Sequence, residues 1–245
     1  MGNEVFNESN PYQYGVRVTE PKPGESGIYR RPDSVNGLAT RNYIGKFTQL
    51  ECVEYYMEKR PNSNFLGSRE YNRSTKKYGK YVWKSYAEIY ELSKCFAYGI
   101  AKLNLCPEIS VDDEILGKGI KMKFLGFLAK TRLEWIVGNL GCQFDNIAIV
   151  PLYETLGINS IEYILKQTEL TDIFVETNSL ELILKLKETN QIGYVKNIIY
   201  LHCDEEKPNL EETKEKLKNY GFNLISYDTL IATGKKCLEQ KKISI

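Results

Sequence analysis

The stretch KMKFLGFLAKTRLEWIVGNLGCQFDNIAIVPLYETLG, residues 121–157, decides the fold of this 245-residue chain. It contains two short apolar runs, Phe124–Leu128 and Ile147–Val150, in which polar and apolar residues do not alternate. Strands of a parallel sheet have this pattern because both of their faces are buried. The stretch therefore predicts a strand, a crossover helix and a second, parallel strand. The apolar face of that helix is formed by Leu133, Ile136, Val137 and Leu140.

The predicted crossover helix carries a start signal that recurs along the chain. Thr131 followed by Glu134 has the spacing of a capping box, in which the first side chain accepts from a free backbone N–H group and the glutamate reaches back. Strands that return about every 25 residues, each behind such a helix, describe a doubly wound parallel sheet of repeated βα units. The further cap pairs are Ser85 with Glu88, Asn159 with Glu162, Asn178 with Glu181 and Asn209 with Glu212, and the further strands are Ile173–Val175, Ile198–Leu201 and Leu224–Ile225.

The chain is predicted to have three parts. Residues 1–45 are rich in Asn, Pro, Gly and charge, which predicts an extended N-terminal arm. Residues 46–234 are predicted to form an α/β portion. Near its start, the short β-prone runs Phe65–Gly67 and Tyr81–Trp83 flank a polar stretch and predict a β-hairpin. Residues 235–245 are predicted to be an irregular basic tail.

Composition and charge exclude several classes of protein. With 33 Lys and Arg against 32 Asp and Glu, the net charge of +1 gives no reason to expect a nucleic-acid partner. The six cysteines have no metal-ligand spacing, so we expect free thiols in a cytoplasmic protein. No apolar run approaches the roughly 20 residues that cross a bilayer. The consecutive acidic residues 112–114 are predicted to lie in a solvated loop, because they lack the alternate spacing of a calcium site.

Residues at the carboxyl ends of the predicted strands are the first candidates for ligand binding. His202 lies beside Cys203, which suggests a base, a nucleophile or a metal ligand, but adjacent residues of an extended chain point to opposite faces, so we favour a structural histidine. Gly234 and Lys235 do not form a phosphate loop, because Thr229 stands where that motif needs glycine. From the residues alone we assign no catalytic residue and no metal ligand, and cofactor-binding residues are unknown. The strand-end candidates are Lys130, Tyr153, Glu154, Thr155, Glu176, Thr177, His202, Asp204, Tyr227 and Asp228.

Two segments resemble the eukaryotic long-chain acyl-CoA synthetases, which belong to the AMP-forming adenylating superfamily. Ala129–Trp135, AKTRLEW, is similar to their Ala-x-Asn-Arg-x-Glu-Trp segment. Val150–Gly157, VPLYETLG, is similar to their Val-Pro-Leu-Tyr-Asp-Thr-Leu-Gly segment. The resemblance spans nearly the whole chain but only the N-terminal third of such an enzyme, which implies that residues 46–234 are the N-terminal α/β portion of an adenylating domain. Shorter matches in the same order are Gly27–Arg30, Leu66–Arg69 and Trp83–Tyr86.

The resemblance implies an enzyme that converts a fatty acid and ATP to an acyl-adenylate and then, with CoA, to acyl-CoA. The family holds ATP and Mg²⁺ with a Ser/Thr/Gly-rich phosphate loop, an aromatic-Thr-Glu segment, a ribose-binding Asp and a lysine of a small C-terminal domain. The sequence contains none of these motifs. A phosphate loop would be expected soon after a segment like 223–236. We therefore expect no cofactor for this chain alone and expect the isolated chain to be inactive.

Two interpretations of the resemblance stay open. The first is an N-terminal fragment or truncated paralogue of a long-chain fatty acid:CoA ligase, for which fatty acid and CoA are partners only in the full-length enzyme. The second is a non-catalytic scaffold or interaction module derived from that family, which pairs with a full-length relative. The resemblance also implies peripheral association with the endoplasmic reticulum or peroxisomal membrane.

Overall fold

The computed structural model of the chain describes residues 14–38, 44–113 and 117–240. The chain divides into two compact units, residues 1–52 and 53–245.

The first unit contains a small antiparallel ribbon. Strand β1 (Val16–Arg17) pairs with β2 (Tyr29–Arg30), and a 3-10 helix, η1 (Pro32–Ser34), follows. The region that was predicted to be an extended arm is thus partly paired with itself. Helix α1 (Gln49–Lys59) begins in this unit and ends in the second.

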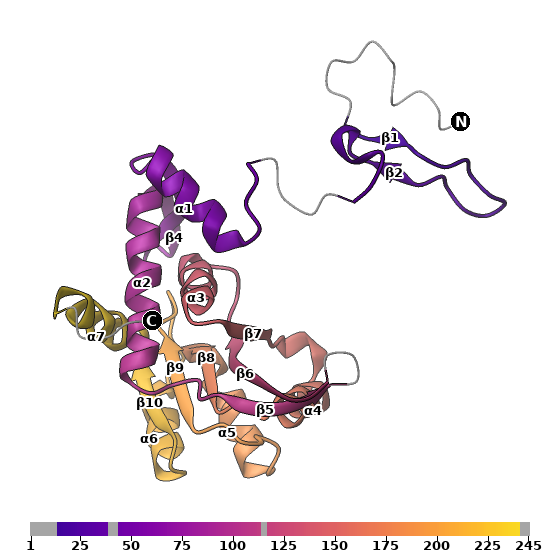
Figure 1. Cartoon of the computed structure of the whole chain (residues 1–245). Coiled ribbons are helices and arrows are strands. Elements are labelled where there is room, and N and C mark those ends of the chain that lie inside the picture. The colour runs from indigo at the N-terminus through magenta and orange to yellow at the C-terminus, as the bar shows by residue number, and fades with distance from the viewer. Residues whose placement is uncertain (1–13, 39–43, 114–116, 241–245) are drawn as a thin grey trace. The chain divides into compact units, whose positions relative to one another are not determined.

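Among the described residues, the main sheet of the second unit has six strands, and five of them are parallel, in the order β7-β6-β8-β9-β10 (Figure 1). The chain passes from β6 to its neighbour on one side and then returns to add β8, β9 and β10 on the other. This confirms the predicted doubly wound α/β sheet. The strands are β6 (Gly117–Leu128), β7 (Ile147–Pro151), β8 (Asp172–Glu176), β9 (Asn197–Leu201) and β10 (Asn223–Ser226).

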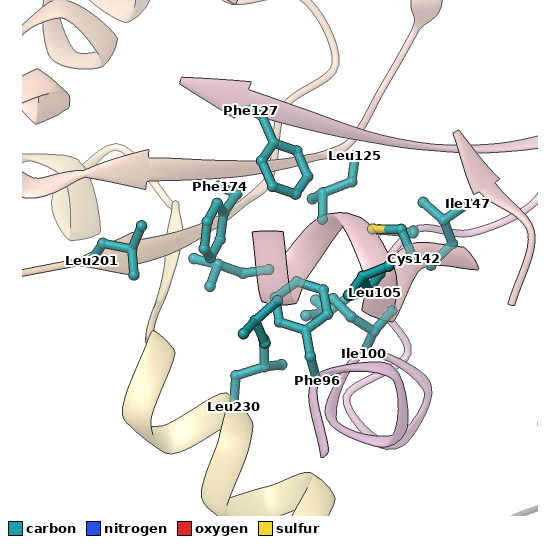
Figure 2. Close-up of a cluster of buried hydrophobic side chains, with 14 of the residues drawn as sticks. Phe96, Ile100, Leu105, Leu125, Phe127, Cys142, Ile147, Phe174, Leu201 and Leu230 are labelled. Atoms are coloured by element: carbon teal, nitrogen blue, oxygen red, sulfur yellow. The ribbon is translucent and has the colours of Figure 1, made fainter. Parts of the chain in front are cut away.

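Helices cover both faces of this sheet, which explains the continuous apolar runs. Within β8, Phe174 packs into one core, whereas Ile173 and Val175 pack into the other, and all three are fully buried. Figure 2 shows Phe96, Phe127 and Phe174 converging in the first core, with ring centroids of Phe127 and Phe174 4.9 Å apart. The first core contains residues of α2 (Tyr86–Lys102), α3 (Leu133–Phe144) and α7 (Tyr227–Gln240), and the second contains residues of α4 (Ile158–Thr168), α5 (Leu180–Glu188) and α6 (Leu210–Asn219).

Helices α2 and α7 cross at unusually close range. A Cβ atom built on Gly234 of α7 would lie 1.7 Å from the carbonyl oxygen of Cys95 in α2. A Cβ atom on Gly99 would lie 2.4 Å from the carbonyl oxygen of Leu230. The two glycines therefore let the helix backbones touch where any larger residue would separate them.

The predicted hairpin is present and is longer than the sequence indicated. Strand β3 (Asn64–Asn72) pairs antiparallel with β4 (Lys77–Ser85). The capping box predicted after it is also confirmed, because the backbone N–H of Glu88 donates to the Ser85 hydroxyl at 3.2 Å and the backbone N–H of Ser85 donates to the Glu88 carboxylate at 2.7 Å.

The other predicted caps were wrong. Helices α3, α4, α5 and α6 have no side-chain cap hydrogen bond, and the residue before the first turn is Arg132 in α3, Gly157 in α4 and Ser179 in α5. Tertiary partners explain part of the failure: Asn178 donates to the carbonyl of Glu205, and Asn209, although correctly placed before α6, donates to Glu181. Spacing alone does not reveal such competing partners.

Two regions that were predicted to be irregular have regular structure. Strand β5 (Ile109–Asp113) pairs antiparallel with the first half of β6, so Asp112 and Asp113 lie in a strand rather than a loop. Residue 114 lies outside the described residues. Residues 235–240 of the predicted basic tail complete α7, and the remainder of that tail also lies outside the described part of the chain.

Replacing Asp172 by Ala is expected to lower the free energy of unfolding by about 1–3 kcal/mol, because a buried N–H group would lose its acceptor. The Asp172 side chain is fully buried and accepts from the backbone N–H of Cys106 and from Nδ2 of Asn197, both at 2.9 Å. Urea denaturation of the two proteins measures the difference. The matched control is Asp145→Ala, which removes a carboxylate paired with Lys123 at a partly exposed site. Equal losses in the two variants would contradict the prediction.

Candidate functional site

The strand order places a topological switch point between β6 and β8. The chain leaves β6 for β7 on one side and later enters β8 on the other, so the loops after β6 and β8 diverge. Crevices that bind ligands in open parallel sheets form at such points, beyond the carboxyl ends of the strands. We call the polar residues gathered there the strand-end cluster: Arg132, Glu134, Glu176, Thr177, His202 and Glu206.

Arg132 is the centre of the strand-end cluster. Its Nε and Nη2 atoms donate to the two carboxylate oxygens of Glu134 at 2.7 and 3.1 Å. Its Nη1 atom donates to the backbone carbonyl of His202 at 3.0 Å and lies 3.4 Å from the Glu176 carboxylate. One guanidinium therefore joins the ends of β6, β8 and β9. Burial lowers the pKa of Arg132, but hydrogen bonding to Glu134 and the charges of Glu134 and Glu176 raise it on balance.

Removing the Arg132 charge is expected to destabilise the second unit by about 2–4 kcal/mol, because Glu176 would keep a buried carboxylate without its cation. The Glu176 side chain is only 10% exposed and that of Arg132 is 25% exposed. The test compares Arg132→Met with the double variant Arg132→Met/Glu176→Gln by urea denaturation. The double variant is expected to recover part of the loss, and strictly additive effects would contradict the coupling. Lys207→Met, which breaks a surface pair with Glu181, is the control and is expected to cost under about 1 kcal/mol.

The second half of the cluster is centred on Glu206. Its carboxylate accepts from the Thr177 hydroxyl and from the backbone N–H of Cys203 at 3.0 Å, and it pairs with Nδ1 of His202 at 2.8 Å. Burial raises the pKa of Glu206, but these three hydrogen bonds outweigh it and hold the pKa below its ordinary value. His202 is therefore bonded to a carboxylate, and its side chain is 51% exposed.

The structure brings some of the sequence candidates together and separates others. Glu176, Thr177 and His202 join the strand-end cluster, which also contains three residues that strand-end position did not single out, Arg132, Glu134 and Glu206. An Arg-x-Glu sequence just after a strand was the available signal for Arg132. The remaining candidates lie elsewhere or apart: Lys130, Tyr153, Glu154, Thr155 and Asp228 are exposed, and Asp204 accepts from Tyr78 of the hairpin.

Tyr227 lies at the start of α7, against the aromatic core. Its ring packs near those of Phe96 and Phe174, and its hydroxyl is buried without a hydrogen-bond partner among the described residues. Burial, followed by the charges of Glu134 and Asp228, raises its pKa above the ordinary value. Tyr227 therefore packs against the core, and the charges of Glu134 and Arg132 in the strand-end cluster act on its hydroxyl.

The described residues contain neither a metal-binding cluster nor a membrane-spanning helix. Residues 14–38, 44–113 and 117–240 contain no group of three or more His, Cys, Asp or Glu side chains placed to hold a metal ion. Within the same residues, every helix is too short or too polar to cross a membrane.

Curated proteins that are similar to this chain are long-chain acyl-CoA synthetases. Long chain acyl-CoA synthetase 5 of Arabidopsis thaliana is 29% identical over 89% of the chain, and long chain acyl-CoA synthetase 3 of the same plant is 34% identical over 74%. Human long-chain-fatty-acid–CoA ligase 1 is 31% identical over 57% of the chain. The chain spans only 29%, 26% and 18% of the length of these three relatives.

Solved structures with a similar fold are adenylation domains. The A-PCP didomain of carboxylic acid reductase from Segniliparus rugosus, in complex with AMP, superposes with a TM-score of 0.59 over 76% of this chain and 26% of that one, at 16% identity. The adenylation domain of a carboxylate reductase from Mycobacterium chelonae gives 0.57 over 80% of this chain at 15% identity. The sequence itself matches the AMP-binding enzyme family over residues 63–236, most of its length. The chain therefore belongs to the family of AMP-binding enzymes.

Proposed function

We propose that this chain provides the N-terminal α/β portion of a long-chain fatty acid:CoA ligase, which forms an acyl-adenylate from a fatty acid and ATP and then transfers the acyl group to CoA. The observation that carries the proposal is the family match over residues 63–236, together with relatives that are named long-chain acyl-CoA synthetases. The doubly wound sheet, which resembles adenylation domains, supports the same assignment.

The strand-end cluster does not fit a nucleotide phosphate or its Mg²⁺. A phosphate would need a cation or N–H donors that are not already engaged. Arg132 already donates to Glu134, Glu176 and the His202 carbonyl, and the Glu206 carboxylate is held by three donors. We therefore assign this cluster a structural role at the switch point and route no step of the reaction through it.

Sequencing the transcript past the codon of Ile245 tests the proposal. An in-frame continuation that encodes a Ser/Thr/Gly-rich phosphate loop soon after Gln240 would support it. The encoded protein would then be expected to form acyl-CoA from a long-chain fatty acid, ATP and CoA. A stop codon directly after Ile245 would contradict the ligase assignment.

The second candidate is a non-catalytic interaction module that pairs with a full-length relative. The polar groups of the strand-end cluster bond to one another, so they stabilise the switch point itself. This favours a non-catalytic role. Co-purification of the tagged chain with a full-length synthetase from the same cells tests this candidate. A monomer that elutes alone would contradict it.

The proposal also includes peripheral association with the endoplasmic reticulum or peroxisomal membrane. Its support is the relative from Penicillium brevicompactum, 26% identical over 73% of the chain, whose name places that protein in the peroxisome. Fractionation of cells that express the tagged chain, with salt extraction of the membrane fraction, tests this part.

A further inference from the structure

The β3–β4 hairpin is strongly basic, although the chain as a whole is nearly neutral. Over residues 64–85 it has six basic side chains and one acidic side chain, Glu70, whereas the whole chain has a net charge of +1. A local excess of this size attracts an anionic surface. The six basic residues are Arg69, Arg73, Lys76, Lys77, Lys80 and Lys84.

The same hairpin exposes large aromatic side chains. Every residue from Lys77 to Trp83 is exposed, and Tyr81, Val82 and Trp83 are 62%, 47% and 51% exposed in succession. Three consecutive exposed apolar residues in a soluble domain call for a functional explanation. Lysines on a free strand edge protect against aggregation, but they do not account for exposed aromatic rings.

The strand register holds two of these rings on one face of the hairpin. Tyr81 lies opposite Arg69 and Trp83 lies opposite Gly67, so both side chains project from the same face, with ring centroids 6.0 Å apart. Because Gly67 has no side chain, the indole can lie across the neighbouring strand, and a Cβ atom at Gly67 would be 3.0 Å from it. Lys77 and Lys84 pair with Asn72 and Leu66 and therefore project from the opposite side of the strand, where residues 77–83 are also exposed. We call the exposed stretch 77–83, which is open to solvent on both sides, the outer hairpin face.

The hairpin is fixed to the loop that follows β9. The Tyr78 hydroxyl donates to Asp204 at 3.0 Å, and the Tyr71 hydroxyl donates to Glu205. The Arg69 guanidinium bridges the hairpin by donating to the carbonyl of Gly79 at 2.7 Å and to that of Tyr78. Asp204 and Glu205 of this loop are therefore engaged by tyrosines of the hairpin, which holds the hairpin in place.

We propose that the outer hairpin face binds the surface of an anionic lipid bilayer. Trp and Tyr are the side chains that settle at the headgroup level, since their rings are apolar and their N–H and O–H groups are wet. Lys and Arg beside them gain from the negative surface potential. A single-stranded nucleic acid would also attract aromatic and basic residues, but it is held in a groove that tracks its backbone. A two-stranded hairpin with every residue of one stretch exposed presents a projecting surface, which suits a bilayer.

The inference rests on the membrane part of the proposed function and names the surface responsible. Vesicle binding requires neither ATP nor fatty acid, so its failure is distinguishable from failure of the ligase assignment. On binding to the bilayer, Trp83 is expected to move from water into the headgroup layer.

Tryptophan fluorescence of the whole chain gives the direct readout. The chain has two tryptophans, and Trp135 packs in α3 against Phe127 with ring centroids 5.5 Å apart. A blue shift on adding vesicles that contain about one-third phosphatidylserine is expected to come from Trp83. Vesicles of phosphatidylcholine alone are expected to give little shift, and Trp83→Phe is expected to abolish it.

Co-sedimentation with the same vesicles tests whether the hairpin lysines contribute to binding. Lys77→Gln/Lys80→Gln is expected to weaken binding about 25-fold, since each lysine near an anionic surface contributes about fivefold in affinity. The matched control is Lys235→Gln/Lys236→Gln, which removes two exposed lysines of α7 and is expected to bind as the parent does. Circular dichroism verifies that both variants are folded.

Three outcomes would overturn the proposal. These are equal binding to neutral and anionic vesicles, equal losses in the hairpin and α7 variants, or tighter binding of the parent chain to a single-stranded oligonucleotide than to the anionic vesicles at the same salt concentration. Binding that depends on phosphatidylserine, weakens at high salt and requires Trp83, Lys77 and Lys80 would establish it.

Discussion

Given ATP, Mg²⁺ and a long-chain fatty acid, the purified 245-residue chain is expected to release pyrophosphate no faster than a sample without protein. Adenylation brings a carboxylate against an α-phosphate, so its transition state needs preorganised N–H donors and cations around the phosphates. The sequence contains no phosphate-loop motif, and Arg132, the central cation at the switch point, is bonded to Glu134 and Glu176. Losing one oxyanion donor already costs about 100- to 1000-fold in rate.

A coupled pyrophosphate assay measures this result, with a full-length relative such as Arabidopsis long chain acyl-CoA synthetase 5 as the positive control. Turnover above background that disappears on heating the chain would contradict the prediction. In that case, Arg132→Met would show whether the strand-end cluster takes part, provided that the variant remains folded by circular dichroism.

The second large effect is expected at the contact between α2 and α7. Gly234→Ala should lower the free energy of unfolding by about 3 kcal/mol or more, because the new methyl group would overlap the Cys95 carbonyl and force the helices apart. Thermal and urea denaturation followed by circular dichroism measure the loss. Near-complete unfolding at room temperature would also satisfy the prediction.

The control for this substitution is Gly79→Ala in the hairpin. There the nearest atom to an added Cβ is the Glu70 carbonyl oxygen at 3.5 Å, an ordinary contact, so a change within about 0.5 kcal/mol is expected. If Gly234→Ala and Gly79→Ala had similar small effects, the close approach of α2 and α7 would not be a constraint on the fold.

The sheet could be predicted from the sequence because its physical signal is local. A strand buried on both faces must be apolar throughout, and Ile173–Val175 is such a run. The starts of the helices were harder to predict from the sequence, because a cap depends on which partner a side chain bonds to in the folded chain. Asn178 fits a cap by spacing, yet its partners are the backbone groups of Glu205 and Lys207, from a later loop.

The sequence predicted where the candidate site lies but not all of the residues that form it. The carboxyl ends of the strands indicated Glu176, Thr177 and His202, and these residues do lie together. Arg132, Glu134 and Glu206 were missed because each lies some residues beyond the end of its strand and returns to the sheet only in the folded chain. Strand β5 was missed for a related reason. Its acidic residues resembled a solvated loop, and its pairing with β6 forms only when the chain folds.

The contact between Gly99 and Leu230 has a consequence for the order in which the protein can fold during synthesis. Helix α2 leaves the ribosome early, but α7, against which it packs, emerges roughly 130 residues later, which at about 5–20 residues per second is a delay on the order of ten seconds. During that interval the face of α2 around Gly99 has no α7 to cover it. The nascent chain therefore keeps this face of α2 uncovered until α7 has been made.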